Sequence, residues 1–128
     1  MGYRAYVSDV SYYSGKLEAY LRYAAVPHER IEINSRLLRE VILPATGVMK
    51  VPVMQCPDGR WLKDTTPMLQ WLDAQHGAPS IYPADAGARF IALLVEDYAD
   101  EWLWRPAMHY RWYYPEGEHE LARAENVS

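Results

Sequence analysis

The sequence predicts an α/β fold in which a mixed sheet carries helices and is followed by an all-helical segment. Short segments of alternating large and small or apolar and polar residues are interleaved with segments whose apolar residues recur at helical spacing. A Pro-Asp-Gly turn at residues 57–59 joins two short apolar segments as a hairpin. After this pattern, residues 86–104 carry one long apolar stripe, which indicates a long amphipathic helix.

The first elements form a strand-helix-strand unit. Residues 3–7 and 28–33 alternate as strands do. Between them, apolar residues spaced three and four apart predict a helix that ends at Pro27; they are Leu17, Tyr20, Leu21 and Ala24. Two strands joined through a helix are parallel, and we expect a right-handed crossover.

The following elements complete the domain. Residues 34–43 have helical spacing, and we expect Pro44 to close that helix. Residues 51–54 and 61–63 are the hairpin strands, which add an antiparallel edge to the sheet. Residues 65–75 form the last helix, which we expect to end with Gly77 in a left-handed cap. The order βαβ, helix, ββα is that of a thioredoxin-like domain.

Composition limits the function classes. The chain has 128 residues, half of them hydrophobic, which suits one domain or a small domain with part of another. A net charge of −4 without a basic run argues against nucleic-acid binding. Cys56 is the single cysteine, so an internal disulfide is impossible and a cytoplasmic location is expected. No apolar stretch is long enough to span a membrane, and the N-terminus has no signal-peptide core.

Two neighbouring features outline a small-molecule site. Pro52 cannot donate to a sheet ladder, so it must stand at the first residue or the edge of its strand, and the Val51-Pro52 bond can be cis. Asp64 and Thr65 stand where a helix begins, with Thr65 as the expected cap. The free N–H groups of a first helical turn attract an anion, such as a carboxylate.

These residues resemble the N-terminal domain of glutathione transferases. The resemblance lies in Lys50-Val51-Pro52-Val53, Asp58-Gly59 and the run Asp64-Thr65-Thr66-Pro67-Met68-Leu69, and it extends to residues 11–16. It implies a thioredoxin-like fold with a cis proline. It also implies that glutathione is the co-substrate, that Val51 and Pro52 hold its cysteinyl backbone, and that Asp64 and Thr65 hold its γ-glutamyl end. Lys50 is a candidate for the glycyl carboxylate or is simply a solvated lysine.

Ser11 is the candidate that activates the glutathione thiol. It lies just before the first helix, where a hydroxyl and the positive end of the helix stabilise a thiolate. In serine-type members of the resembling family a serine at this place does that work. The alternative is that Ser11 is only a helix cap, with Ser14 as a second candidate cap, and a phenol from Tyr6, Tyr12 or Tyr13 is a further possibility. Cys56 reads as a structural residue, and no Cys-x-x-Cys motif points to a dithiol reductase.

The resemblance also predicts how the chain divides into domains. We expect a glutathione-binding domain at residues 1–76, a linker at 77–85, and the first part of a truncated all-helical domain at 86–128. The chain is then either a piece of a longer protein or a naturally short one. In a truncated domain, six aromatic side chains of this last part would have too little protein surface to pack against, and we expect them to mediate a homodimer or a swapped assembly. They are Trp102, Trp104, Tyr110, Trp112, Tyr113 and Tyr114.

Two functions remain open at this point. The first is a glutathione transferase that conjugates the thiolate of glutathione to a small electrophile, although a fragment can be inactive. The second is a non-catalytic binding or assembly module that uses the same fold. The four histidines have no metal-ligand spacing, so neither reading includes a metal site.

Overall fold

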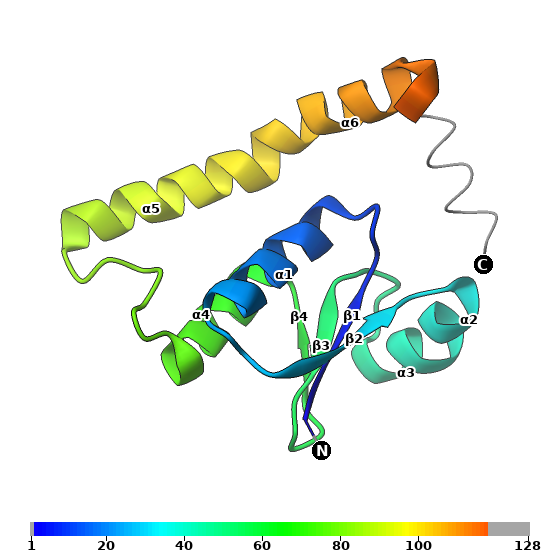
Figure 1. Ribbon diagram of the computed structural model, residues 1–128, viewed down its shortest axis with the longest axis horizontal. Helices are drawn as coiled ribbons and strands as arrows, with labels where there is room; N and C mark the ends of the chain where they lie inside the picture. Colours follow the sequence, from blue (N-terminus) through cyan, green and yellow to red (C-terminus); the bar gives the residue numbers. More distant parts are fainter. Residues whose placement is uncertain (1, 118–128) are drawn as a thin grey trace. The chain divides into compact units, whose positions relative to one another are not determined.

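The computed structural model describes residues 2–117, and its elements appear in Figure 1. The described residues fall into two compact units, one that runs to Pro79 and one that begins at Ser80.

The first unit is built on a four-stranded mixed sheet in the order β2-β1-β3-β4. β1 and β2 are parallel, whereas β1 pairs with β3 and β3 pairs with β4 in antiparallel fashion. The expected parallel unit and the antiparallel edge are both confirmed. The strands are β1 (Tyr3–Val7), β2 (His28–Glu32), β3 (Val53–Gln55) and β4 (Trp61–Lys63).

Helices cover both faces of the sheet (Figure 1). α1 (Tyr12–Tyr23) and α4 (Thr65–His76) pack on one face, where their apolar residues join Ala5, Val7 and Met54 in a fully buried core. Tyr6 and Val53 point to the opposite face and pack there with Ile42. Successive strand residues therefore alternate between two cores, which is what the period of two requires.

The second helical segment is longer than the sequence indicated, so the prediction that Pro44 closes it is wrong. α2 (Ser35–Leu37) runs into the π-helical η1 (Leu38–Ile42) and then into α3 (Leu43–Thr46). Pro44 lies just after the π-helical η1 within this continuous run, so its missing N–H interrupts the backbone bonding without ending the helix. The helix ends instead at Gly47, whose φ of 75° makes the left-handed cap.

The ends of α4 also differ from the sequence-based expectation. The residue at the N-cap is Asp64, and Thr65 is the first helical residue, so Thr65 is not the cap. Gly77 at the other end is extended, with φ of −70°, and its N–H bonds to the carbonyl of Asp73 at 2.8 Å. Ala78-Pro79 follows at once as a cis bond.

The second unit is helical from Ala86 to Tyr113: α5 (Ala86–Tyr98), η2 (Ala99–Leu103) and α6 (Trp104–Tyr113). The long helix therefore passes the expected end at Trp104. Pro106 cannot donate to the carbonyl four residues earlier, and the π-helical η2 lies just before this interruption. The expected C-terminal segment also includes residues 118–128, which lie outside the described residues.

Candidate functional site

Strand register brings the candidate site residues to one end of the sheet. Val53 pairs with Tyr6 on β1 and with Lys63 on β4. Because both pairs are antiparallel, the chain leaving β1, the chain entering β3 and the chain leaving β4 meet at the same sheet end. Those three chain segments carry, respectively, Ser11, Val51 with Pro52, and Asp64 with Thr65.

Ser11 is the N-cap residue of α1. Its backbone is extended and its Oγ accepts a hydrogen bond from the Ser14 N–H at 3.1 Å. The hydroxyl proton is not used by this bond, so it can be donated to another group. Capping and donation to a ligand are therefore compatible in the observed geometry.

The other hydroxyl candidates have structural surroundings. Ser14 is fully buried, and its Oγ accepts from the Ser8 N–H at 3.1 Å, so it fixes the preceding turn and does not cap α1. Tyr6 is buried against Trp61, with ring centroids 5.1 Å apart. Tyr12 and Tyr13 lie at the start of α1 with their rings edge to face, 5.3 Å apart.

The segment before β3 has the geometry that the resemblance implies. The Val51-Pro52 bond is cis, and Pro52 is buried immediately before the strand begins at Val53. Lys50 is exposed beside it. The neighbouring Lys63 bridges to the end of α3, where its Nζ donates to the Thr46 carbonyl at 2.9 Å.

The N-terminus of α4 is shaped by an unusual backbone. Asp64 has φ of 70° and ψ of 117°, a conformation that non-glycine residues rarely adopt, and its side chain makes no cap hydrogen bond. Pro67 lacks an N–H, so Thr65 and Thr66 carry the first backbone donors of this helix. Lys16 on α1 also reaches this turn, where its Nζ lies 3.4 Å from Thr66 Oγ1. Positive charge and backbone donors thus gather where an anion would bind.

Two features of this site were not predicted from the sequence. No local pattern distinguishes Lys16 from a solvated lysine, because its approach to Thr66 depends on how α1 packs on α4. The strained backbone of Asp64 likewise has no sequence signature, since aspartate is ordinary before a helix.

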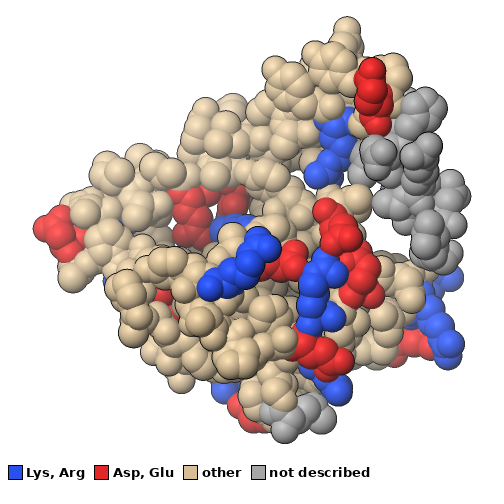
Figure 2. Space-filling view, in the orientation of Figure 1, with Lys and Arg blue, Asp and Glu red and all other residues tan. Residues whose placement is uncertain are grey.

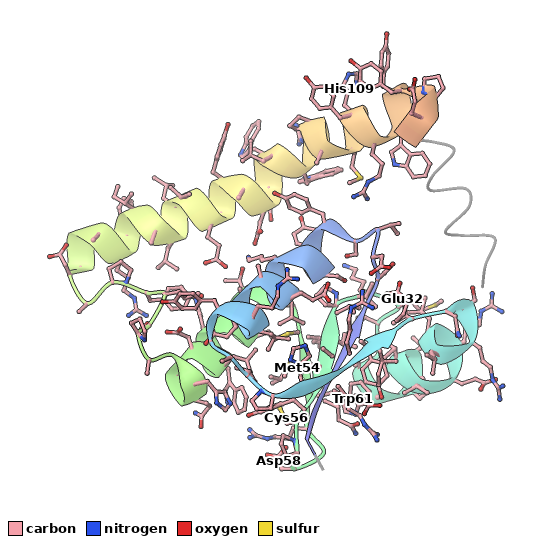
Figure 3. All side chains as sticks on the ribbon, in the orientation of Figure 1. Glu32, Met54, Cys56, Asp58, Trp61 and His109 are labelled. Atoms are coloured by element: carbon pink, nitrogen blue, oxygen red, sulfur yellow. The ribbon has the colours of Figure 1, made fainter. Side chains whose placement is uncertain are left out.

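Cys56 and Asp58, two side chains with perturbed pKa values, lie at the other end of the sheet. Burial raises the pKa of the Cys56 thiol, which is fully buried beneath the 57–59 turn. Bonds from the Arg60 backbone and side chain lower the pKa of Asp58 in that turn. Figure 3 labels both residues, away from the end that carries Glu32. Cys56 is therefore a structural residue remote from Ser11, as the sequence suggested.

The described part of the chain offers neither a metal site nor a membrane span. Within residues 2–117, no group of three or more His, Cys, Asp or Glu side chains is placed to hold a metal ion. No helix in that range is long and apolar enough to cross a bilayer.

Comparison with known proteins decides the family. The model of the glutathione S-transferase N-terminal domain matches residues 6–80, well over half of the chain. The chain belongs to the glutathione S-transferase family. A comparison with curated proteins found no match for this glutathione S-transferase family member.

Solved structures of glutathione S-transferases share its fold. One from Methylobacterium radiotolerans, in complex with glutathione sulfonate, is 24% identical with a TM-score of 0.70, over 78% of this chain and 47% of its own. The Tau class enzyme from mango is 24% identical with a TM-score of 0.71, over 82% and 48%. A diazinon-metabolizing enzyme from the silkworm Bombyx mori is 19% identical with a TM-score of 0.75, over 99% and 64%. The chain thus spans about half the length of the first two structures.

Proposed function

We propose that this chain binds glutathione and, as a glutathione S-transferase, joins its thiolate to a small electrophile. The observation that carries the proposal is the convergence of Ser11, Val51 and the start of α4 at one end of the sheet. Family membership supports it, as do related structures that contain glutathione or glutathione sulfonate.

The ligand would lie along that sheet end in an extended conformation. The α-carboxylate at the γ-glutamyl end accepts from the first backbone donors of α4, at Thr65, and the Asp64 carboxylate pairs with the ligand's ammonium group. The cysteinyl backbone pairs with Val51 beside Pro52. Lys50, exposed just before them, is within the same segment and offers a cation to the glycyl carboxylate.

Ser11 would activate the thiol. Its hydroxyl donates to the thiolate while its oxygen continues to accept from the Ser14 N–H, and the positive end of α1 adds to the stabilisation. The thiol loses its proton to solvent, and the sulfur attacks the electrophilic carbon. For an aryl halide a C–S bond forms, the C–Cl bond breaks and chloride leaves, so the reaction needs no redox partner.

Titration calorimetry and a conjugation assay test this proposal together. We expect the wild-type chain to bind glutathione and to conjugate chlorodinitrobenzene, and Ser11→Ala to keep binding but to conjugate roughly 10- to 100-fold more slowly. Binding without conjugation in the wild type would favour the non-catalytic module. Lack of binding at millimolar glutathione would refute the glutathione-binding proposal itself.

We also propose the domain boundaries, the cellular location and the oligomeric state. We assign residues 1–76 as the glutathione-binding domain, 77–85 as a linker and 86–128 as the beginning of a helical domain, in a cytoplasmic protein with one cysteine. The six aromatics of the second unit are 38–68% exposed, which supports a homodimer formed through that surface. Size-exclusion chromatography with light scattering should give twice the chain mass, and a monomer at micromolar concentration would contradict the dimer.

A further inference from the structure

One arginine on the edge strand β2 holds three carboxylates around the turn that leads to Ser11. The Nε of Arg30 donates to Glu18 Oε1 on α1 at 2.6 Å, and its Nη2 lies 3.0 Å from Glu32 Oε2. The same Nη2 also donates to Asp9 Oδ1 in the turn. We call Asp9, Glu18, Arg30 and Glu32 the Arg30 cluster. Its members come from the turn, from α1 and from β2, so it ties three segments together.

The turn itself is short and held at both ends. The Ser11 N–H donates to the Ser8 carbonyl at 2.9 Å, which places Asp9 and Val10 at its centre. The Ser8 N–H is bonded to Ser14, and the Asp9 N–H donates to Glu32 Oε1 at 3.1 Å. Asp9 is thus fixed through both its backbone and its side chain, two residues before Ser11.

We propose that Arg30 is a positioning residue for Ser11, which fixes the turn before it and offsets the negative charge of the three carboxylates. This inference rests on the proposed function, because it assigns Arg30 a role in placing the hydroxyl that meets the glutathione thiol. Arg30 does not contact the ligand; it acts through Asp9 and the turn.

Charge and exposure favour this role over a purely stabilising one. The side chain of Arg30 is 36% exposed and that of Asp9 is 77% exposed, and exposed ion pairs add little to stability. The Arg30 cluster still carries two negative charges after Arg30 is counted. Negative charge near a thiol disfavours its thiolate, so loss of Arg30 would oppose the activation that Ser11 provides. Figure 2 shows acidic and basic side chains intermixed on the visible face of the first unit.

The chain offers a matched control for this idea. Arg4 on β1 pairs with the single carboxylate of Glu29 at 2.9 Å and is 37% exposed, but neither residue touches the turn. Arg30→Gln and Arg4→Gln remove the same charge from neighbouring strands. Arg30→Lys keeps the charge without the planar fork that reaches several carboxylates.

The experiment has two readouts on the full chain: the pKa of bound glutathione, from thiolate absorbance against pH, and hydrogen exchange of amides in residues 8–14. We expect Arg30→Gln to raise the thiol pKa by about half a unit, the effect of one charge at roughly 10 Å near a surface when it is screened by about 0.1 M salt. We expect it to speed exchange in the turn about threefold or more. Arg4→Gln should change neither, and Arg30→Lys should restore most of the thiol pKa while exchange stays fast.

The outcomes separate the two proposals. If the wild-type chain binds no glutathione, the proposed function fails, and exchange that is equal in Arg30→Gln and wild type would also refute the positioning role. If glutathione binds normally but Arg30→Gln leaves thiol pKa and exchange as in Arg4→Gln, only the role of Arg30 is refuted. Should Arg30→Gln fail to fold, Arg30→Lys provides the same comparison through the exchange readout.

Discussion

The capping and catalytic roles of Ser11 can be separated by a pair of substitutions. Ser11→Ala removes both the acceptor for the Ser14 N–H and the hydroxyl proposed to meet the thiol. Ser11→Gly also has no side-chain donor, but glycine at an N-cap costs only a few tenths of a kcal/mol. The two variants therefore share the catalytic loss and differ in stability.

The magnitudes follow from the observed bond. Losing the cap costs about 1 kcal/mol, which lowers the melting temperature by about 4–8 °C for a domain of this size. A hydrogen bond to a charged group contributes about 1.5–3 kcal/mol, so losing the hydroxyl would raise the thiol pKa by about one to two units. At neutral pH the conjugation rate would fall roughly 10- to 100-fold in both variants.

Thermal unfolding and chlorodinitrobenzene conjugation measure the two effects on the same samples. We expect Ser11→Ala to be less stable and slow, and Ser11→Gly to be nearly as stable as wild type and equally slow. If Ser11→Gly conjugates at the wild-type rate, Ser11 is a cap and nothing more. Equal stability of all three proteins would contradict the capping geometry.

Three further predictions concern other positions. Asp64→Gly should relieve the strain of the positive φ, so the free energy of unfolding should stay equal or rise by about 1 kcal/mol. Glutathione affinity, measured by calorimetry, should fall about tenfold because the carboxylate is lost, and unchanged affinity would contradict the proposed ammonium contact. Leu72→Ala should cost about 2–5 kcal/mol in urea unfolding because Leu72 is fully buried, whereas Leu43→Ala at 38% exposure should cost far less, and equal losses would refute the packing described. Burial raises the pKa of the Cys56 thiol, so the folded state keeps the thiol proton while the unfolded state loses it, and stability should fall as pH rises above about 8.5. Cys56→Ala should flatten this fall, and an unchanged pH profile of stability would show that Cys56 does not cause the fall.

Local patterns predicted the elements but not all of their ends. Alternation located β1 and β2, and the Pro-Asp-Gly turn located β3 and β4, because these signals lie within a few residues of each other. The prediction for Pro44 was wrong because a proline can end a helix or lie within one. Here the packing of Ile42 and the cap at Gly47 set the end of the helix. The prediction of a left-handed cap at Gly77 was wrong for a similar reason, since a glycine allows the left-handed conformation without requiring it.

In the candidate site, too, local motifs predicted some features, and others depend on packing. The residues near Val51 and Asp64 carried a recognisable motif, so they were predicted together. The approach of Lys16 to Thr66 and the ties from Arg30 to Asp9 and Glu18 depend on how α1 packs, and no local pattern reports that. The roles of Ser11 as cap and as catalytic donor could not be distinguished from sequence, because both need the same residue at the same helix end.

The most direct test of the account is a glutathione titration followed by amide chemical shifts of the full chain. The account predicts saturable shifts at Val51 and Thr65, near the cysteinyl backbone and the γ-glutamyl carboxylate, with a smaller shift at Ser11. A glutathione analogue without the γ-glutamyl α-carboxylate should lose the response at Thr65 and keep the one at Val51. Shifts confined to other parts of the chain, or no shifts at millimolar glutathione, would contradict it.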